Sequence, residues 1–133
     1  MKPLPEGTRL YHATSADVAD ALMAGGFDDR QSHWGTEPIS EYYAETVDDE
    51  NPDEEEGKAS AVLSVLLSDL DQDLLHVDQP AVDEPICSAI GMKEHQVHEA
   101  WARCDGTWQD SLEISGSVVY RGPIAATLLT REC

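Results

Sequence analysis

The sequence predicts an α+β fold whose strands pair mainly in the antiparallel direction. Two amphipathic helices are expected in the first third of the chain, and strand patterns dominate from residue 59 onward. The regular strand–helix–strand alternation that builds a parallel sheet is missing. With 133 residues, of which 41% are hydrophobic, the chain is long enough to bury one core, so we expect a single domain over residues 1–133.

The first expected strand runs directly into the first expected helix. The segment "LYHAT", residues 10–14, begins as a strand and is followed by a helix-start pattern. Thr14 is a suitable N-cap, with Asp17 three residues later, and apolar residues then recur at helical spacing. The pair Gly25–Gly26 ends the helix, because glycine adopts left-handed C-cap geometry without a steric cost.

A second strand and helix are expected next, followed by an acidic loop. The segment "HWGT", residues 33–36, predicts a short strand, and Pro38 suits the first turn of a helix. The expected inner face of that helix consists of Ile39, Tyr42, Tyr43 and Thr46. Residues 47–58 then carry seven carboxylates. Because such a run repels itself and stays hydrated, we expect an acidic surface loop there.

The second half of the chain contains the clearest strand pattern. Apolar residues alternate with serines between residues 59 and 68, as in a strand with one buried face. Another apolar segment follows at residues 73–80, and residues 91–104 read as a helix. The tail adds two or three short strands, with the candidates "DSLEIS" (110–115), "SVVY" (117–120) and "PIAATLL" (123–129).

The charge balance restricts the classes of partner. The chain has 27 acidic and 8 basic residues, for a net charge of −19. Direct binding to nucleic acid needs a basic surface that meets the phosphates, so we do not expect it. The acidity serves solubility or salt adaptation, or it provides a surface that docks on a basic partner. For the same reason an enzyme that acts on a polyanionic substrate such as RNA is disfavoured.

The sequence also predicts where in the cell the protein is found and whether it binds a metal ion. No apolar run approaches the roughly 18–20 residues of a membrane span, and the N-terminus lacks the apolar region of a signal peptide. Three cysteines without metal-ligand spacing indicate reduced thiols in a cytoplasmic protein. His95, His98 and Glu99 share a helix face but lack the His-Glu-x-x-His order and a third ligand, so no metal site is expected.

Three separated segments together resemble one known family. They are "LYHAT", then "HWGTEPISEYYAE", then "SLEISGSVV". Their order is a histidine at the end of an early strand, a helix that closes in "GGF", an aromatic strand that turns into a helix with S-x-x-Y-A, and a late glutamate. This arrangement resembles the ADP-ribosyltransferase superfamily, in the branch whose signature is His, Tyr, Glu. The similarity covers roughly the first 45 and the last 25 residues.

The resemblance implies a fold and a set of residues that bind NAD. The fold is a split antiparallel β-sandwich of two small sheets with a few flanking helices. His12 matches the histidine that holds the nicotinamide-side ribose. Ala13 stands where the family usually has the glycine that clamps the nicotinamide amide through its backbone, and Thr14 matches the small hydroxyl residue that follows. Ser40 matches a serine that hydrogen-bonds this amide in some members.

Two aromatic residues are implied to sandwich the nicotinamide ring. Tyr43 matches the tyrosine that stacks on it, with Tyr42 as the competing choice, and Trp34 occupies the place of an aromatic on the opposite wall. Ser40 and Tyr43 lie three residues apart, so they share one helix face. Cation–π attraction to such a ring contributes about 0.5–2 kcal/mol.

The resemblance assigns catalysis to Glu113, on a late strand. Cleavage of the nicotinamide–ribose bond develops positive charge on the sugar, and a carboxylate aimed at it stabilises the transition state. Ser111 stands where many relatives have Glu or Gln to orient the acceptor, which makes transfer to arginine less favoured. Only eight basic residues are available for the pyrophosphate of NAD, so backbone amides are the expected partners.

Two functions follow from the resemblance and the charge. The first is an NAD-dependent mono-ADP-ribosyltransferase, a glycosyltransferase-type enzyme that uses NAD as substrate, modifies a protein acceptor with a basic surface and releases nicotinamide. Such an enzyme could be a bacterial toxin or effector, or a phage inhibitor of bacterial immunity, acting in the cytoplasm of its own, a host or a rival cell. The alternative is an inactive module of the same fold whose acidic surface blocks a basic partner.

Overall fold

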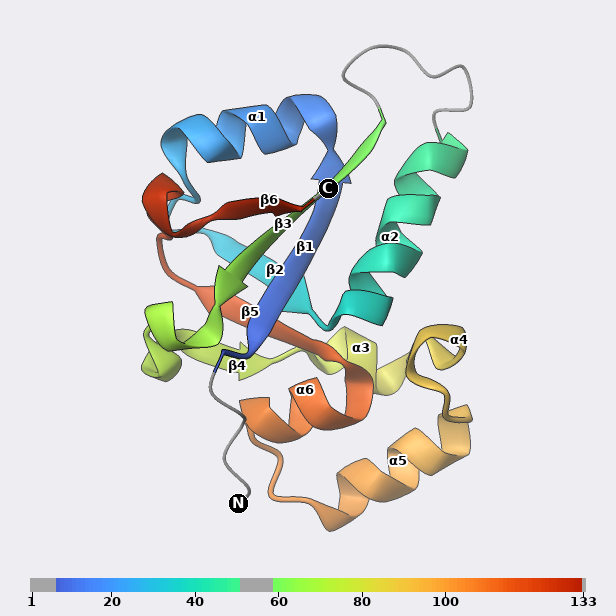
Figure 1. The fold of residues 1–133 in the computed structure, drawn as a ribbon. Helices are drawn as coiled ribbons and strands as arrows, with labels where there is room; N and C mark the ends of the chain where they lie inside the picture. Colours follow the sequence, from blue (N-terminus) through green and yellow to red (C-terminus); the bar gives the residue numbers. More distant parts are fainter. Residues whose placement is uncertain (1–6, 51–58, 133) are drawn as a thin grey trace.

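The described part of the chain contains one antiparallel sheet of six strands, in the order β4-β5-β2-β1-β3-β6 (Figure 1). A computed structural model describes residues 7–50 and 59–132. The strands are β1 (Arg9–Ser15), β2 (Gln31–Gly35), β3 (Ser60–Leu66), β4 (Leu75–Val77), β5 (Ser117–Arg121) and β6 (Thr130–Glu132). All strand pairs are antiparallel, which confirms the predicted α+β class.

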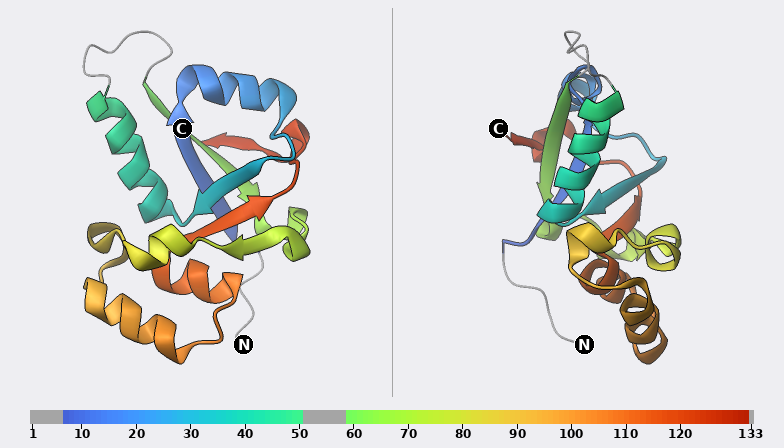
Figure 2. Two further views of the ribbon diagram at one scale, coloured as in Figure 1. Left: turned by 180° about the vertical axis from the view of Figure 1, so that it is seen from behind. Right: turned by 90° about the vertical axis from the view of Figure 1, so that its right-hand side faces the viewer.

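Within residues 7–50 and 59–132 the sheet is accompanied by six α-helices and three short 3₁₀ helices. The α-helices are α1 (Ala16–Gly25), α2 (Glu37–Glu50), α3 (Gln79–Asp83), α4 (Cys87–Ile90), α5 (Glu94–Arg103) and α6 (Trp108–Ser115). The 3₁₀ helices are η1 (Leu67–Asp69), η2 (Gln72–Leu74) and η3 (Ala126–Leu128). Helices α3 to α6 gather at one end of the molecule, beside β4 and β5, while α1 lies at the other end (Figures 1 and 2).

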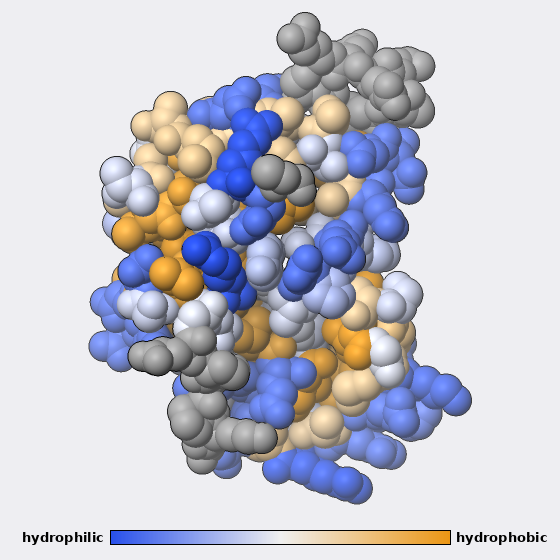
Figure 3. All heavy atoms as spheres, viewed as in Figure 1, coloured by the Kyte–Doolittle hydropathy of each residue, from blue (hydrophilic) through white to orange (hydrophobic). Residues whose placement is uncertain are grey.

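The main core lies between α1 and the sheet. Leu10, Leu63 and Val65 are fully buried on one face of the β1–β3 pair, and Ala19 of α1 is buried against the same cluster. The strand predicted within residues 59–68 is present, and Leu63 and Val65 face the core as predicted, but Ala59 is exposed and Ser64 on the opposite face is also fully buried. Figure 3 shows hydrophilic residues over much of one outer face, with hydrophobic residues visible between them.

The predicted division into two small sheets is replaced by one sheet with a narrow join. β1 pairs with β3 over its whole length, from Arg9↔Leu66 to Ser15↔Ser60. β2 pairs with β5 over its whole length in the same way. Between β1 and β2, however, the register contains the single pair Tyr11↔Gly35. Two well-paired halves therefore meet at one point and diverge beyond it.

The N-terminal helices occur where the sequence predicted them, with altered ends. Thr14 belongs to β1, and Ser15 takes the N-cap position of α1 that we had predicted for Thr14. α2 continues to Glu50, so residues 47–50 of the predicted acidic loop are helical; residues 51–58 lie outside the described residues. On α2 the buried residues are Ile39 and Ser40 rather than the tyrosines.

Two of the three predicted strands in the tail are wrong. Residues 110–115 belong to helix α6, which begins with a capping box between Thr107 and Asp110 and ends at Gly116 in left-handed conformation. The segment 123–129 forms one isolated bridge between Ile124 and Phe27 and then the 3₁₀ helix η3. Only 117–120 is a strand, within β5.

Gly116 supports the turn between α6 and β5 and should not tolerate a side chain. Its φ is +78°, and a Cβ would lie 2.7 Å from the Cγ1 atom of Ile39. We expect Gly116→Ala to lower the free energy of unfolding by about 2–4 kcal/mol, from backbone strain and overpacking together. Urea unfolding measures the loss. Gly91→Ala is the control, because Gly91 has a φ of +69° with no atom within 4 Å, so only the strain of about 1–2 kcal/mol applies. Equal losses in both variants would contradict the crowding by Ile39.

Candidate functional site

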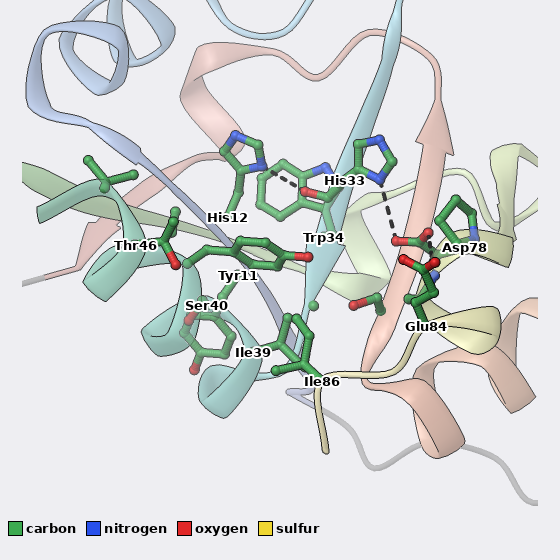
Figure 4. Close-up of a pocket in the computed structure, with 17 residues that line it drawn as sticks. Tyr11, His12, His33, Trp34, Ile39, Ser40, Thr46, Asp78, Glu84 and Ile86 are labelled. Atoms are coloured by element: carbon green, nitrogen blue, oxygen red, sulfur yellow. Dashed lines mark hydrogen bonds and ion pairs between the residues drawn. The ribbon is translucent and has the colours of Figure 1, made fainter. Parts of the chain in front are cut away.

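A cavity of about 510 Å³ opens where β1 and β2 diverge, between these strands, α2 and the α3 region (Figure 4). The lining residues are Tyr11, His12 and Ala13 from β1, His33, Trp34 and Gly35 from β2, Ile39, Ser40, Tyr43, Thr46 and Val47 from α2, and Asp78, Pro80, Ala81, Glu84, Ile86 and Ser117. None of these lining residues is a lysine or an arginine, whereas two are acidic. The cavity therefore suits a ligand with an aromatic or cationic part.

His12 lines the cavity and bonds across the join to the neighbouring strand. Its Nδ1 lies 2.6 Å from the backbone carbonyl oxygen of His33. Because a carbonyl only accepts, Nδ1 carries the proton and donates, which leaves Nε2 as an acceptor. Burial lowers the pKa of His12 below its ordinary value, more than the bond to the His33 carbonyl raises it. At neutral pH, His12 is therefore a neutral imidazole with one acceptor nitrogen.

Trp34 contributes to the cavity from within the core. Only 1% of its surface is exposed, and its Nε1 donates to the Ser32 hydroxyl at 2.8 Å. Its ring centroid lies 5.4 Å from that of His12 and 5.2 Å from that of Phe27. These contacts make Trp34 a packed core residue at the cavity wall, which leaves little of its face for stacking on a ligand.

Helix α2 supplies the more accessible aromatic. Tyr43 lines the cavity, is 46% exposed and lies one turn from Ser40, which also lines it. Tyr42 does not line this cavity, so the geometry selects Tyr43 from the two candidates. Burial raises the pKa of Tyr43, with smaller contributions from the Asp78 charge and from Tyr42, so the phenol stays protonated. The Ser40 hydroxyl donates to the Glu37 carbonyl at 2.8 Å and retains acceptor capacity.

The remaining predicted residues divide between the cavity and other places. Ala13 lines the cavity, whereas Thr14 does not. Glu113 is exposed on α6 and is absent from the cavity lining, so the structure does not bring it to His12 and Tyr43. The strand assumed for Glu113 is wrong because the capping box at Thr107 starts a helix, and its buried side consists of Ser111, Leu112 and Ser115.

The sequence reasoning missed a histidine–carboxylate pair in the cavity. His33 Nδ1 lies 3.4 Å from Oδ2 of Asp78, and both residues line the cavity. The other carboxylate oxygen of Asp78 accepts from the backbone N–H of Ala81 at 3.3 Å and so caps α3. The hydrogen bond with Asp78 raises the pKa of His33, which outweighs the effect of burial.

Buried serines hold Asp78 in place. The Asp78 backbone N–H donates to the Ser111 hydroxyl at 3.1 Å, and this hydroxyl donates to the Ser117 carbonyl at 2.7 Å. Ser111 therefore positions a cavity residue through its hydroxyl, a different role from the acceptor-orienting place that the resemblance gave it. The signal available in the sequence was the Asp78-x-Pro80 pattern, which is typical of a helix start.

Glu84 is the second acidic group of the cavity. It follows α3 directly, is exposed, and lines the same cavity as Asp78 (Figure 4). Nothing in the local pattern of residues 79–86 marks Glu84 as a site residue. Its place in the cavity depends on how α3 packs against α5 and α6.

The pKa values of the two cavity histidines are expected to lie on opposite sides of 6.5, the ordinary value for histidine. An NMR titration of the ring protons should give a pKa below 6.5 for His12, from burial, and above 6.5 for His33, from Asp78. Because the His12 ring binds a proton more readily in the unfolded protein than in the folded one, His12 lowers the free energy of unfolding as the pH falls through 6.5. His33 acts in the opposite sense, and its stabilisation is lost as pH rises through its raised pKa. A lower pKa for His33 than for His12 would contradict this assignment.

Metal-ligand clusters and membrane-spanning helices are both absent from residues 7–50 and 59–132. No group of three or more His, Cys, Asp or Glu side chains there is placed to hold a metal ion. Within the same ranges, no helix has both the length and the apolar character needed to cross a membrane. Comparison of the chain with protein-family models, curated proteins and solved structures finds no match.

Proposed function

We propose that the chain is an NAD-dependent ADP-ribosyltransferase, which cleaves NAD, releases nicotinamide and transfers ADP-ribose to a protein acceptor. One observation carries the proposal: the residues that the resemblance assigns to NAD line a single cavity although they belong to three separate elements. These residues are His12, Ala13, Trp34, Ser40 and Tyr43. Only Thr14 and Glu113 of the predicted set lie outside the cavity lining.

The shape of the sheet is consistent with this proposal. The resemblance implies two small sheets that separate around the dinucleotide. β1, β3 and β6 form one half here and β2, β4 and β5 the other, joined at the Tyr11–Gly35 pair. The cavity lies at this join. We propose that NAD enters between the two halves, with its nicotinamide end toward α2.

The cavity chemistry favours the nicotinamide end of NAD. The nicotinamide ring of NAD is a cation, and an exposed tyrosine ring attracts such a group by about 0.5–1 kcal/mol. Tyr43 provides that ring, and the carboxylates of Asp78 and Glu84 add favourable charge. The neutral His12 offers Nε2 as an acceptor for a ribose hydroxyl.

The cavity also suggests which carboxylate supports bond cleavage. As the nicotinamide–ribose bond breaks, positive charge develops on the sugar, and a nearby carboxylate stabilises it. Glu113 was expected in this role but lies outside the cavity. Asp78 is engaged by His33 and by the cap of α3. We therefore assign the role to Glu84, the other acidic residue of the lining.

The experiment that tests the function uses NAD itself. Millimolar NAD should raise the melting temperature of the protein, because a ligand that binds only the folded state stabilises it by about 2.7 kcal/mol at 100 times its Kd. NAD should also be converted, with free nicotinamide as the product. Labelled NAD added with a cell lysate should mark an acceptor protein. Absence of both a melting shift and nicotinamide release would overturn the proposal.

A second candidate function is a binding module without turnover. It is favoured by the absence of lysine and arginine from the cavity lining and by the net charge of −19. In this case the cavity and its surroundings would receive a basic side chain of a partner protein. The two candidates differ in one measurement, since only the enzyme releases nicotinamide.

A further inference from the structure

We infer that His33 and Asp78 form a proton-accepting pair, in which His33 is the general base for the acceptor and Asp78 positions it. This inference rests on the proposed function. It also specifies the acceptor as a hydroxyl group, the side chain of a serine or threonine on the acceptor protein.

The first support is the way in which Asp78 is held. Its side chain is only 10% exposed, so its orientation is fixed by its surroundings. One carboxylate oxygen accepts from Ala81, and the backbone N–H is bound by Ser111. The remaining oxygen, Oδ2, is the one that faces His33 Nδ1 at 3.4 Å. A rigid carboxylate beside one ring nitrogen selects the tautomer in which that nitrogen carries the proton.

The second support is the exposure of His33. Its side chain is 56% exposed, in contrast to Asp78. When Nδ1 donates to Asp78, Nε2 carries the lone pair and serves as the base. The backbone of the same residue contacts the proposed ribose clamp, because its carbonyl accepts from His12 at 2.6 Å. His33 therefore contacts, through its backbone, the residue that would hold the reacting sugar.

The third support is chemical and concerns the acceptor. Thiols and carboxylates reach an ionised, nucleophilic form near neutral pH, but an aliphatic hydroxyl does not and needs an adjacent base. In the proposed step, the acceptor oxygen forms a bond to the ribose carbon as the bond from that carbon to the nicotinamide nitrogen breaks. The bonding electrons go to nicotinamide, which leaves neutral, and the hydroxyl proton goes to His33 Nε2. Asp78 stabilises the resulting imidazolium.

Several charged or titratable groups surround this pair and affect its pH dependence. Asp78 faces His33 from the cap of α3, and Glu84 lies at the end of that helix. Neighbouring elements carry the further groups: His12 and Tyr11 on β1, Tyr43 on α2, Arg121 on β5 and His76 on β4. Arg121 pairs with Gln31, and His76 and His33 both pair with Val119 of β5. Of these, Asp78 dominates the behaviour of His33 because it alone is hydrogen-bonded to the ring.

The test uses the full chain, NAD and methanol as a hydroxyl acceptor probe. His33→Asn should lower the rate of methyl ADP-ribose formation by about 10²–10⁴, the usual contribution of a general base. The melting shift caused by NAD should persist, since His33 acts on the acceptor. His76→Asn is the matched control, because His76 lies on the same sheet face but outside the cavity, and should keep the wild-type rate.

Asp78→Asn separates a positioning role from a structural one. Asparagine retains an oxygen for the cap of α3 and removes the charge that favours protonated His33. The rate should rise with pH through the His33 titration in the wild type. In Asp78→Asn the midpoint of this rise should move to lower pH, together with the NMR titration of His33. An unchanged midpoint would overturn the role of Asp78.

The outcomes distinguish this inference from the proposed function. A wild type that turns over NAD, combined with an equally active His33→Asn variant, overturns the inference and leaves the enzyme. Loss of the NAD melting shift in His33→Asn would make His33 a ligand-binding residue and also overturn the inference. Transfer to a small guanidine compound but not to methanol would overturn the acceptor class. A wild type without NAD binding or turnover overturns both proposals.

Discussion

Glu84→Gln is expected to lower the rate of nicotinamide release from NAD by about 10²–10³, the usual effect of removing one preorganised charge-stabilising group. Glutamine keeps the shape of the side chain and removes its charge, so the transition state loses stabilisation while the cavity keeps its form. Glu113→Gln is expected to keep the wild-type rate. Glu113 is exposed on α6 and does not line the cavity, whereas Glu84 does.

The measurement is the initial rate of nicotinamide formation at saturating NAD for the wild type and both variants. The two substitutions change the net charge equally, so a general electrostatic effect of the acidic protein would affect both rates alike. The NAD-induced melting shift of each variant reports whether binding persists. An inactive Glu113→Gln variant combined with an active Glu84→Gln variant would return the catalytic role to Glu113.

Trp34→Ala is expected to lower the stability of the protein strongly, whereas Tyr43→Ala is expected to lower its stability little and to remove NAD binding. Trp34 is 1% exposed and packs against His12 and Phe27, so its truncation should lower the free energy of unfolding by about 3–5 kcal/mol. Tyr43 is 46% exposed, and its truncation should cost about 1 kcal/mol or less. The NAD-induced melting shift should nevertheless disappear in Tyr43→Ala, because the accessible stacking ring is lost.

Urea unfolding measures the two stability changes, and thermal unfolding with and without NAD measures binding. Tyr42→Ala is the control for Tyr43→Ala, since Tyr42 has a similar exposure of 41% and contacts the Tyr43 ring but does not line the cavity. It should keep the NAD shift. If Tyr42→Ala loses the shift and Tyr43→Ala keeps it, the geometric choice between the two tyrosines is wrong.

Much of the local structure was predictable from the sequence because its causes are local. The apolar periodicity of residues 91–104 predicts α5, and the alternation of residues 59–68 predicts β3. Pro38 marks the start of α2, and Gly26, with a φ of +76°, marks the end of α1. Each of these signals operates within one or two turns of chain.

The predicted strand at 110–115 failed for a reason that was also local. The alternation of Ser111, Leu112, Glu113 and Ile114 resembles a strand, but the Thr107–Asp110 capping box and Gly116 bound a helix of two turns. A capping box satisfies backbone N–H groups that a strand leaves to a neighbour, so it outweighs a short alternation. Because of this error, Glu113 was predicted to lie on a catalytic strand, whereas it lies on an exposed part of helix α6.

By itself the sequence predicted the α+β class and most element positions, and five of the residues that its resemblance singled out, among them His12 and Tyr43, line one cavity. Only the tertiary structure decided that Asp78, His33 and Glu84 join them and that Glu113 does not. The physical reason is that capping and periodicity act between near neighbours, whereas the cavity arises from a single backbone pairing between β1 and β2 and from the packing of α3 beside it. No short stretch of sequence encodes such a long-range contact.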